Sequence, residues 1–387
     1  MKSLKINHSL LFSATQGLFF CVIYLFLFEF LRYNEADTPN FVNAAKMLLG
    51  QDNLVETQSR ITKPVVLVLP GLINKLWGFK VESIMLFQNI VFVILTAIYF
   101  GKLLQALDFD LKKQQLGIFM LFTVQAIAVH SLELINDIAG IFFSVFITYL
   151  YFKSLQQKKK HLYFYLLFSL SIVIGILSKE SAGMALIIIV PHLLLNESKR
   201  TKYHFSISIL FSGVLILLVQ TVISIYFETH DAFSNVIEEF KINNGFNIRW
   251  AQIPHSFDVY WIFIILGTIS LIKKRKKNHT ANSWLLSGLA TIPFLLLWAT
   301  VQDRTIAVAA PLFIVYILFF VDQYKNKLAL YILIIIAGIG NIISTYLIYK
   351  HNFNNVLEVY YLSYASLFLF LWLFIPYHNF KSINLKP

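Results

Sequence analysis

The sequence predicts an all-α polytopic membrane protein with about twelve transmembrane helices. Its 387 residues are 58% hydrophobic and 13% charged, and the mean hydropathy is +0.69, whereas soluble chains are about 45 to 50% apolar and about 25% charged. The apolar residues also gather in runs close to the roughly 20 residues that a helix needs to cross a bilayer. We expect spans near 10–31, 83–106, 115–130, 138–155, 162–178, 181–195, 205–227, 258–272, 284–300, 306–322, 328–348 and 360–376.

The first apolar run is expected to be a retained membrane anchor. It follows Lys2 and Lys5, and no small-residue cleavage pattern comes after it. The single cysteine, Cys21, lies inside this run, which excludes an intrachain disulfide and a cysteine metal cluster. No fixed-period repeat and no linker rich in proline, glycine or serine divides the chain. We therefore expect one integral membrane domain over residues 1–387.

The positions of lysine and arginine predict the orientation, because cytoplasmic loops carry an excess of these residues. With a cytoplasmic N-terminus, alternating loops place most of the 32 basic residues inside, including the run KKRKK at 273–277, and most of the 20 acidic residues outside. The net charge of +12 is therefore a topology signal and does not predict nucleic-acid binding. We expect an integral protein of a bacterial inner membrane, with its outer loops facing the periplasm.

The segment 64–79 tests this orientation, because it is apolar but short and contains Pro70, Gly71 and Lys75. If it crossed the membrane, every later loop would change sides. We therefore expect an interfacial or re-entrant helix pair. The first outer loop then covers about 32–82, and a second large outer loop covers about 228–257.

A short amphipathic helix is expected near the start of the first outer loop. Thr38 and Pro39 form a helix start signal, and Gly50 is a stop signal. Helical spacing from Asp37 puts Phe41, Ala44, Ala45 and Leu48 on one face. This helix should lie on the outer membrane surface with Asp37 at its N-terminal end.

Asp37, Phe41, Ala45, Leu48 and Gly50 have a spacing that resembles the first outer loop of the GT-C superfamily of integral membrane glycosyltransferases. This superfamily includes the dolichyl-phosphate-mannose protein mannosyltransferases and the bacterial aminoarabinose transferase of lipid A. The resemblance covers most of the first 190 residues and the ninth and tenth spans. The later stretches that agree with it are RITKP at 60–64, LELINDIAGIFFSVF at 132–146, ILSKESAG at 176–183 and QDRTIAVAAP at 302–311.

The resemblance implies a GT-C-like helical bundle that transfers a hexosyl or pentosyl group from a polyprenyl phosphate to a hydroxyl of a lipid, glycan or protein. This chemistry needs a carboxylate to take the proton of the acceptor hydroxyl and cations to hold the leaving phosphate. The expected catalytic acids are Asp37, Glu35 and Asp137. The expected phosphate-binding cations, each on the outer side near a membrane boundary, are Lys179, Arg304, Arg60 and Lys63.

Each of these assignments has a plainer alternative. Asp37 and Asp137 suit helix starts, which acids cap or charge favourably, although Asp137 also suits a metal ligand. The basic residues suit lipid headgroup contacts or local ion pairs. The alternatives are a cap for Asp37, a cap for Asp137 with Glu133 four residues earlier, a pair of Lys179 with Glu180, a pair of Arg304 with Asp303, and headgroup contacts for Arg60 and Lys63.

Cofactor signals are weak in the sequence. The outer histidines lack metal-ligand spacing, so a divalent metal ion stays an open alternative without a defined site. No P-loop and no dinucleotide-binding glycine motif occurs, which favours a lipid-linked sugar donor over a nucleotide sugar. The outer histidines are His130, His230, His255 and His351.

Two other functions fit a protein with many spans. A polymerase or ligase of lipid-linked oligosaccharides shares the outer loops but does not require the Asp37 pattern. A transporter would carry charges in the middle of its spans and repeat symmetry, whereas the charges of this chain cluster at span ends. The glycosyltransferase is therefore the favoured prediction.

Overall fold

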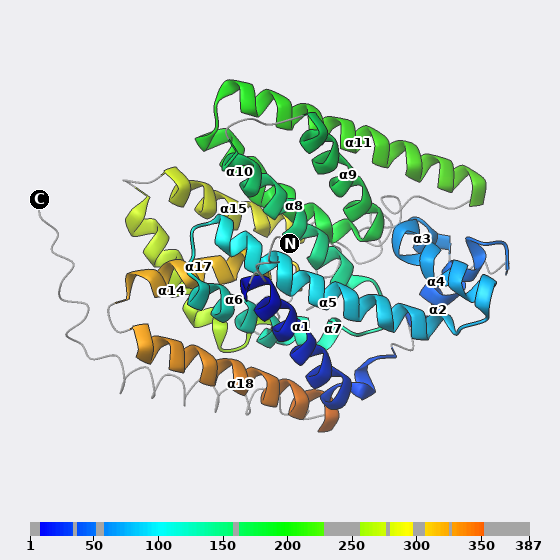
Figure 1. Cartoon of the computed structure of the whole chain (residues 1–387), viewed down its shortest axis with the longest axis horizontal. Coiled ribbons are helices and arrows are strands. Elements are labelled where there is room, and N and C mark those ends of the chain that lie inside the picture. The colour runs from blue at the N-terminus through cyan, green and yellow to red at the C-terminus, as the bar shows by residue number, and fades with distance from the viewer. Residues whose placement is uncertain are drawn as a thin grey trace, which may run out of the picture.

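The computed structural model of the chain describes residues 8–33, 37–51, 58–157, 162–227, 256–275, 279–296, 306–324 and 327–351. Within these ranges all regular structure is helical, which confirms the predicted all-α class (Figure 1). Helices suit these apolar runs because they satisfy every backbone hydrogen bond inside one segment. The first half contains α1 (His8–Leu27), η1 (Glu29–Leu31), α2 (Thr38–Met47), α3 (Gln58–Ile61), α4 (Pro64–Trp77), α5 (Val81–Ala106), α6 (Leu111–Thr123), α7 (Gln125–His130), α8 (Asp137–Leu155) and α9 (Leu162–Ser178). The second half contains η3 (Glu180–Gly183), α10 (Met184–Asn196), α11 (Lys199–Phe227), α14 (Tyr260–Lys274), α15 (His279–Leu296), α17 (Ala310–Gln323) and α18 (Lys327–His351).

Among the described residues, five helices are long and apolar enough to cross a membrane, judged by length and composition. They indicate an integral membrane protein. Shorter apolar helices lie between them in the sequence. The five segments are Ser9–Leu27, Val81–Ala106, Asp137–Leu155, Lys199–Phe227 and Lys327–Lys350.

The expected number of about twelve spans is not supported. Helices α10, α17 and α14 have only 13, 14 and 15 residues, and at about 1.5 Å per residue they are shorter than a hydrocarbon core of about 30 Å. The run expected at 115–130 is divided into α6 and α7, because Val124 between them has an extended backbone with ψ 127°. The span expected at 360–376 lies outside the described residues.

Helix α8 lies at the centre of the bundle. It packs against α5, α9, α10 and η3. Of its most apolar stretch, 78% is buried inside the bundle, whereas the corresponding share in α11 is 17%. Figure 1 shows α11 and α18 at opposite edges, with α5 and α8 between them. The first residue of α8, Asp137, therefore lies in the interior at one end of the bundle, and it is only 5% exposed.

The C-terminal ends of α1, α11 and α18 gather at the same end of the bundle as α2 and α4. The backbone N–H of Leu134 donates to the carbonyl of Arg32, which follows α1 and η1. The ring of Phe30 in η1 contacts Tyr346 of α18, and Phe227 at the end of α11 packs on the apolar cluster of α2 and α4. We call this end the first-loop end; it is the right side of Figure 1.

The opposite end of the bundle is joined by lysine and aspartate side chains. Lys113 Nζ of α6 lies 3.0 Å from Asp110 Oδ2 and 2.6 Å from Asp322 Oδ1 of α17. Asp110 also caps α6, because its side chain accepts a hydrogen bond from the backbone N–H of Lys113. These residues are among those that the charge pattern places on the cytoplasmic side.

Candidate functional site

Asp37 is at the N-cap position of α2, as the sequence predicts, but it does not act as a side-chain cap. Its side chain makes no capping hydrogen bond. Instead Asp37 Oδ1 lies 2.6 Å from Arg60 Nη2, and the Arg60 guanidinium also lies over the ring of Phe41, 5.3 Å from its centroid. The plainer alternative of a capping aspartate is therefore not what the geometry shows. Two residues of the first loop that are 23 positions apart meet here through a charged pair.

The first loop is held in place by the apolar face that the sequence predicts for α2. Phe41, Ala44 and Ala45 are almost completely buried, and they pack against α4 and against Ile135 in the segment before α8. Helix α4 begins at Pro64 and ends at Trp77, and Gly78 directly after it has the left-handed φ of 72° that favours glycine. The helix pair expected within 64–79 is instead one helix, which continues through Pro70 and packs against α2 and α5.

Lys63, which directly precedes α4, pairs with Glu180 of η3. Their Nζ and Oε1 atoms lie 3.2 Å apart, and the Lys63 side chain is 7% exposed. Burial lowers the pKa of Lys63 to about 8; the Glu180 carboxylate opposes this effect, while the charges of Lys179 and Arg60 add to it. Burial alone would raise the pKa of Glu180, but Lys63 and Lys179 hold it below its usual value. Both groups are therefore charged at neutral pH.

Lys179 pairs with Asp137 at the start of α8. The Nζ atom lies 2.6 Å from Asp137 Oδ1 and 3.4 Å from Asn136 Oδ1. The close approach of η3 to α8 depends on Gly140, since a Cβ there would press on Ser181 Oγ and lie 3.0 Å from Lys179 Cγ. Lys179 therefore binds across two helices and does not pair with its neighbour Glu180.

These three pairs form one assembly at the first-loop end, because the charges of Lys179 and Arg60 are close enough to lower the pKa of Lys63. We call the assembly the charge cluster. Its three cations each contact a carboxylate of another segment. Such an arrangement can exchange carboxylate partners for the oxygens of a bound phosphate. The charge cluster consists of Asp37, Arg60, Lys63, Asp137, Lys179 and Glu180.

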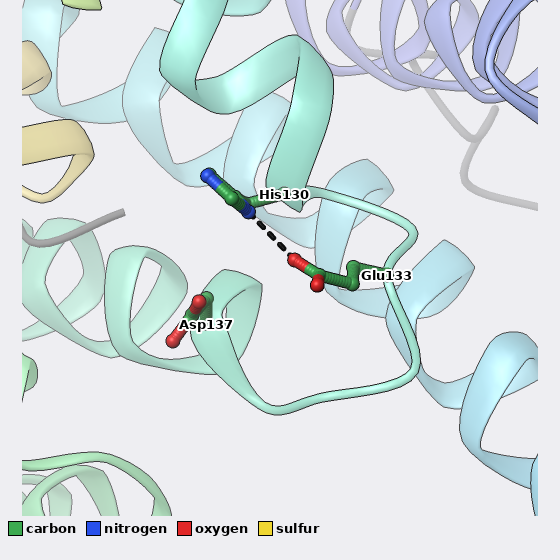
Figure 2. Close-up of side chains that lie close together, drawn as sticks. All are labelled: His130, Glu133 and Asp137. Atoms are coloured by element: carbon green, nitrogen blue, oxygen red, sulfur yellow. Dashed lines mark hydrogen bonds and ion pairs between the residues drawn. The ribbon is translucent and has the colours of Figure 1, made fainter. Parts of the chain in front are cut away.

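His130 and Glu133 lie close to Asp137 of the charge cluster (Figure 2). His130 Nδ1 lies 2.6 Å from Glu133 Oε2, and one ligand atom from each residue lies within 4.8 Å of the others. An imidazole and two carboxylates can hold a divalent metal ion. The spacing of the outer histidines in the sequence does not predict this group, because it is the turn between α7 and α8 that brings His130 to the two acids.

The structure thus brings together Asp37, Arg60, Lys63, Asp137 and Lys179, all of which the sequence singles out. Glu35 and Arg304 lie outside the described residues, as does most of the expected second outer loop. Sequence reasoning missed three participants. Glu180 stands inside the ILSKESAG stretch, but a sequence cannot show that it meets Lys63. The other two are His130 and Glu133.

No protein-family model matches this chain, and no curated protein sequence matches it.

Proposed function

We propose that the protein is a membrane glycosyltransferase that moves a sugar from a polyprenyl phosphate to a hydroxyl of a lipid, glycan or protein. The observation that carries the proposal is the charge cluster, in which the first-loop carboxylate Asp37 shares one end of the bundle with three cations. A lipid-linked sugar has its tail in the bilayer and its phosphate at the surface. A site at the ends of apolar helices suits such a donor.

The phosphate of the donor is held by Lys63, Lys179 and Arg60 in this proposal. The two lysines act as point charges, whereas Arg60 is able to grip two phosphate oxygens at once. Because Arg60 binds Asp37, an incoming phosphate competes with that carboxylate for the guanidinium. Donor binding would then release Asp37 from its ion pair. Arg304 remains a further expected phosphate contact.

Asp37 takes the proton of the acceptor hydroxyl. The acceptor oxygen forms a bond to the anomeric carbon while the bond from that carbon to the phosphate oxygen breaks. The polyprenyl phosphate leaves with the bonding electron pair, and the cations stabilise its charge. Glu35 and Asp137 remain expected acids of the same site.

The second carboxylate oxygen of Glu180 suits a sugar hydroxyl. Glu180 Oε1 contacts Lys63, whereas Oε2 is buried and has no hydrogen-bond partner among the described residues. A buried acceptor of this kind gains stability when a donor reaches it. A hydroxyl of the bound sugar is a donor of the right kind beside the phosphate-binding lysines.

The proposal also includes the finer membrane arrangement. The bundle would be GT-C-like, with its first-loop end facing the periplasm of a bacterial inner membrane. The +12 net charge then marks the cytoplasmic loops.

Mass spectrometry of envelope lipids, glycans and proteins from cells with and without the gene tests this function. We expect one fraction to lose the mass of a single sugar without the gene. We also expect a plasmid carrying the wild-type gene to restore it, and a plasmid carrying Asp37→Asn not to restore it. Loss of long glycan chains with intact single-sugar additions would instead favour a polymerase or ligase. Unchanged fractions in cells that normally express the gene would overturn the proposal.

A further inference from the structure

The segment between α7 and α8 places three metal-ligating side chains in one spot, as Figure 2 shows. His130 ends α7, Glu133 lies in the turn, and Asp137 begins α8. The two acids are only 6% and 5% exposed. Two buried carboxylates so close together repel each other and are costly to desolvate, unless cations offset their charge. One such cation is Lys179, whose Nζ lies 2.6 Å from Asp137 Oδ1, and a bound divalent metal ion would be another.

The turn that carries Glu133 is fixed by hydrogen bonds from other elements. Asn89 Nδ2 of α5 donates to the carbonyls of Glu133 and Ile135 at 2.7 and 3.1 Å. The side chain of Asn136 donates to the carbonyl of Ser178 at the end of α9. These bonds hold the backbone of the turn in one conformation. The ligand set is therefore placed in advance, which lowers the cost of binding an ion.

We propose that His130, Glu133 and Asp137 bind a divalent transition metal ion of the zinc or manganese class. One imidazole and two carboxylates are borderline ligands, whereas Mg²⁺ and Ca²⁺ prefer oxygen ligands alone. Ligands at about 2.1 Å from a tetrahedral ion lie about 3.4 Å apart, so atoms within 4.8 Å of one another need only a small side-chain adjustment. Lys179 contacts Asp137 as a partner outside the ligand set, in the way that ligating carboxylates are commonly held.

Three protein ligands leave at least one coordination position open, which is the arrangement of an ion that binds water or an exogenous ligand. The proposal does not depend on sugar transfer. His130 and Glu133 have no part in the proposed transfer reaction, so variants at these two residues test the metal site separately.

Titration of purified protein with Mn²⁺ and with Zn²⁺ tests the site. The full chain should carry an affinity tag without histidine, be stripped with EDTA and be dialysed in detergent. Electron paramagnetic resonance of free Mn²⁺ and calorimetry with Zn²⁺ report the number of bound ions. We expect one ion per chain. The dissociation constant should be at least about tenfold higher in Glu133→Gln and in His130→Ala, because loss of even an outer partner of a metal ligand typically costs about 10- to 100-fold in metal affinity.

Matched controls lie outside the cluster. Glu82→Gln, in the first turn of α5, and His204→Ala, in α11, should bind the ion as the wild type does. Metal addition should also raise the unfolding temperature of the wild type and of both controls by more than that of Glu133→Gln, because an ion that binds only the folded state stabilises it in proportion to its affinity. Absence of stoichiometric binding in the wild type would overturn the proposal. Equal binding by wild type, Glu133→Gln and His130→Ala would overturn it as well, since His130 and Glu133 would then form only a hydrogen bond.

Discussion

At the scale of single residues, the variant Asp37→Asn distinguishes a catalytic role of Asp37 from a role in helix capping. Its side chain contacts Arg60 and makes no capping hydrogen bond. Asp37→Asn keeps the size and polarity of the side chain but removes its ability to accept a proton. We expect the transfer rate of the purified protein to fall about 10²- to 10⁴-fold, the usual value of general-base assistance. Protein abundance and membrane insertion should stay normal, because Asn has nearly the same size and its amide oxygen can still accept the hydrogen bond from Arg60.

Asp110→Asn is the matched control for this change. Asp110 caps α6 at the opposite end of the bundle, and Asn preserves that role, so its transfer rate should stay near that of the wild type. Wild-type turnover by Asp37→Asn would sink the assignment of Asp37 as the base.

The lowered pKa of Lys63 predicts that the affinity for the donor falls at high pH. Burial lowers its pKa to about 8, below the ordinary value of about 10.4. Lys63 is therefore charged below about pH 8 and loses its charge as the pH rises through that value, whereas a phosphodiester donor keeps its negative charge throughout. We expect the donor dissociation constant to rise above about pH 8, by at most tenfold per pH unit. Binding measured between pH 7 and pH 10 gives this profile.

Lys63→Arg is the informative variant, because a guanidinium keeps its charge across this pH range. The rise in the dissociation constant above about pH 8 should disappear in this variant. An unchanged pH profile would mean that another group controls the affinity.

Lys179→Ala should weaken use of the donor more than use of the acceptor. Its Nζ lies in the charge cluster, and its side chain is only 14% exposed. Loss of a desolvated contact to a charged group costs about 1.5 to 3 kcal/mol, which is about a 10- to 150-fold rise in the donor KM. Lys75→Ala is the control, because Lys75 lies in α4 but is exposed and donates to the Leu49 carbonyl. Equal effects of the two variants would show that Lys179 has only a structural role.

Arg304→Ala should likewise weaken use of the donor more than use of the acceptor.

At the scale of elements, the first loop depends on the close contact of α2 and α4. A Cβ at Gly71 would press on the carbonyl oxygen of Ala45 and lie 3.0 Å from its carbonyl carbon. Backbone atoms cannot rotate away, so Gly71→Ala must push the two helices apart, at a cost of about 1 to 3 kcal/mol. We expect faster protease cleavage within residues 37–63 and weaker donor binding.

Gly213→Ala is the control for this helix contact. Gly213 lies inside α11, and a Cβ there would meet no atom within 4 Å. This substitution should leave the first loop protected and should slightly favour the helix. Equal cleavage of the two variants would show that the contact of α2 with α4 does not hold the loop.

At the scale of the whole molecule, the position of α4 decides which loops face the periplasm. If α4 lies at the interface, reporter fusions after Phe79 and after Phe257 should both report outside, and a fusion after Lys277 should report inside. Alkaline phosphatase and green fluorescent protein fusions distinguish the two sides. A cytoplasmic signal at Phe79 would contradict the loop assignment and would place the charge cluster on the other side.

The sequence by itself determined the class of the protein and the positions of most helices, because apolar runs and helix start and stop signals act over short distances. Thr38 and Pro39 start α2, as their start signal predicts. The buried face of α2, with Phe41 and Ala45, also follows from helical spacing alone.

Only the tertiary structure decided how the charged residues pair and where the helices break. Local reasoning pairs Lys179 with its neighbour Glu180, yet packing of η3 on α8 gives it Asp137 and leaves Glu180 to Lys63. The turn after α7 likewise brings His130 to Glu133 and Asp137. An ion pair forms where the packing of distant segments places two charges together. The order of residues along the chain does not specify the distance between such side chains.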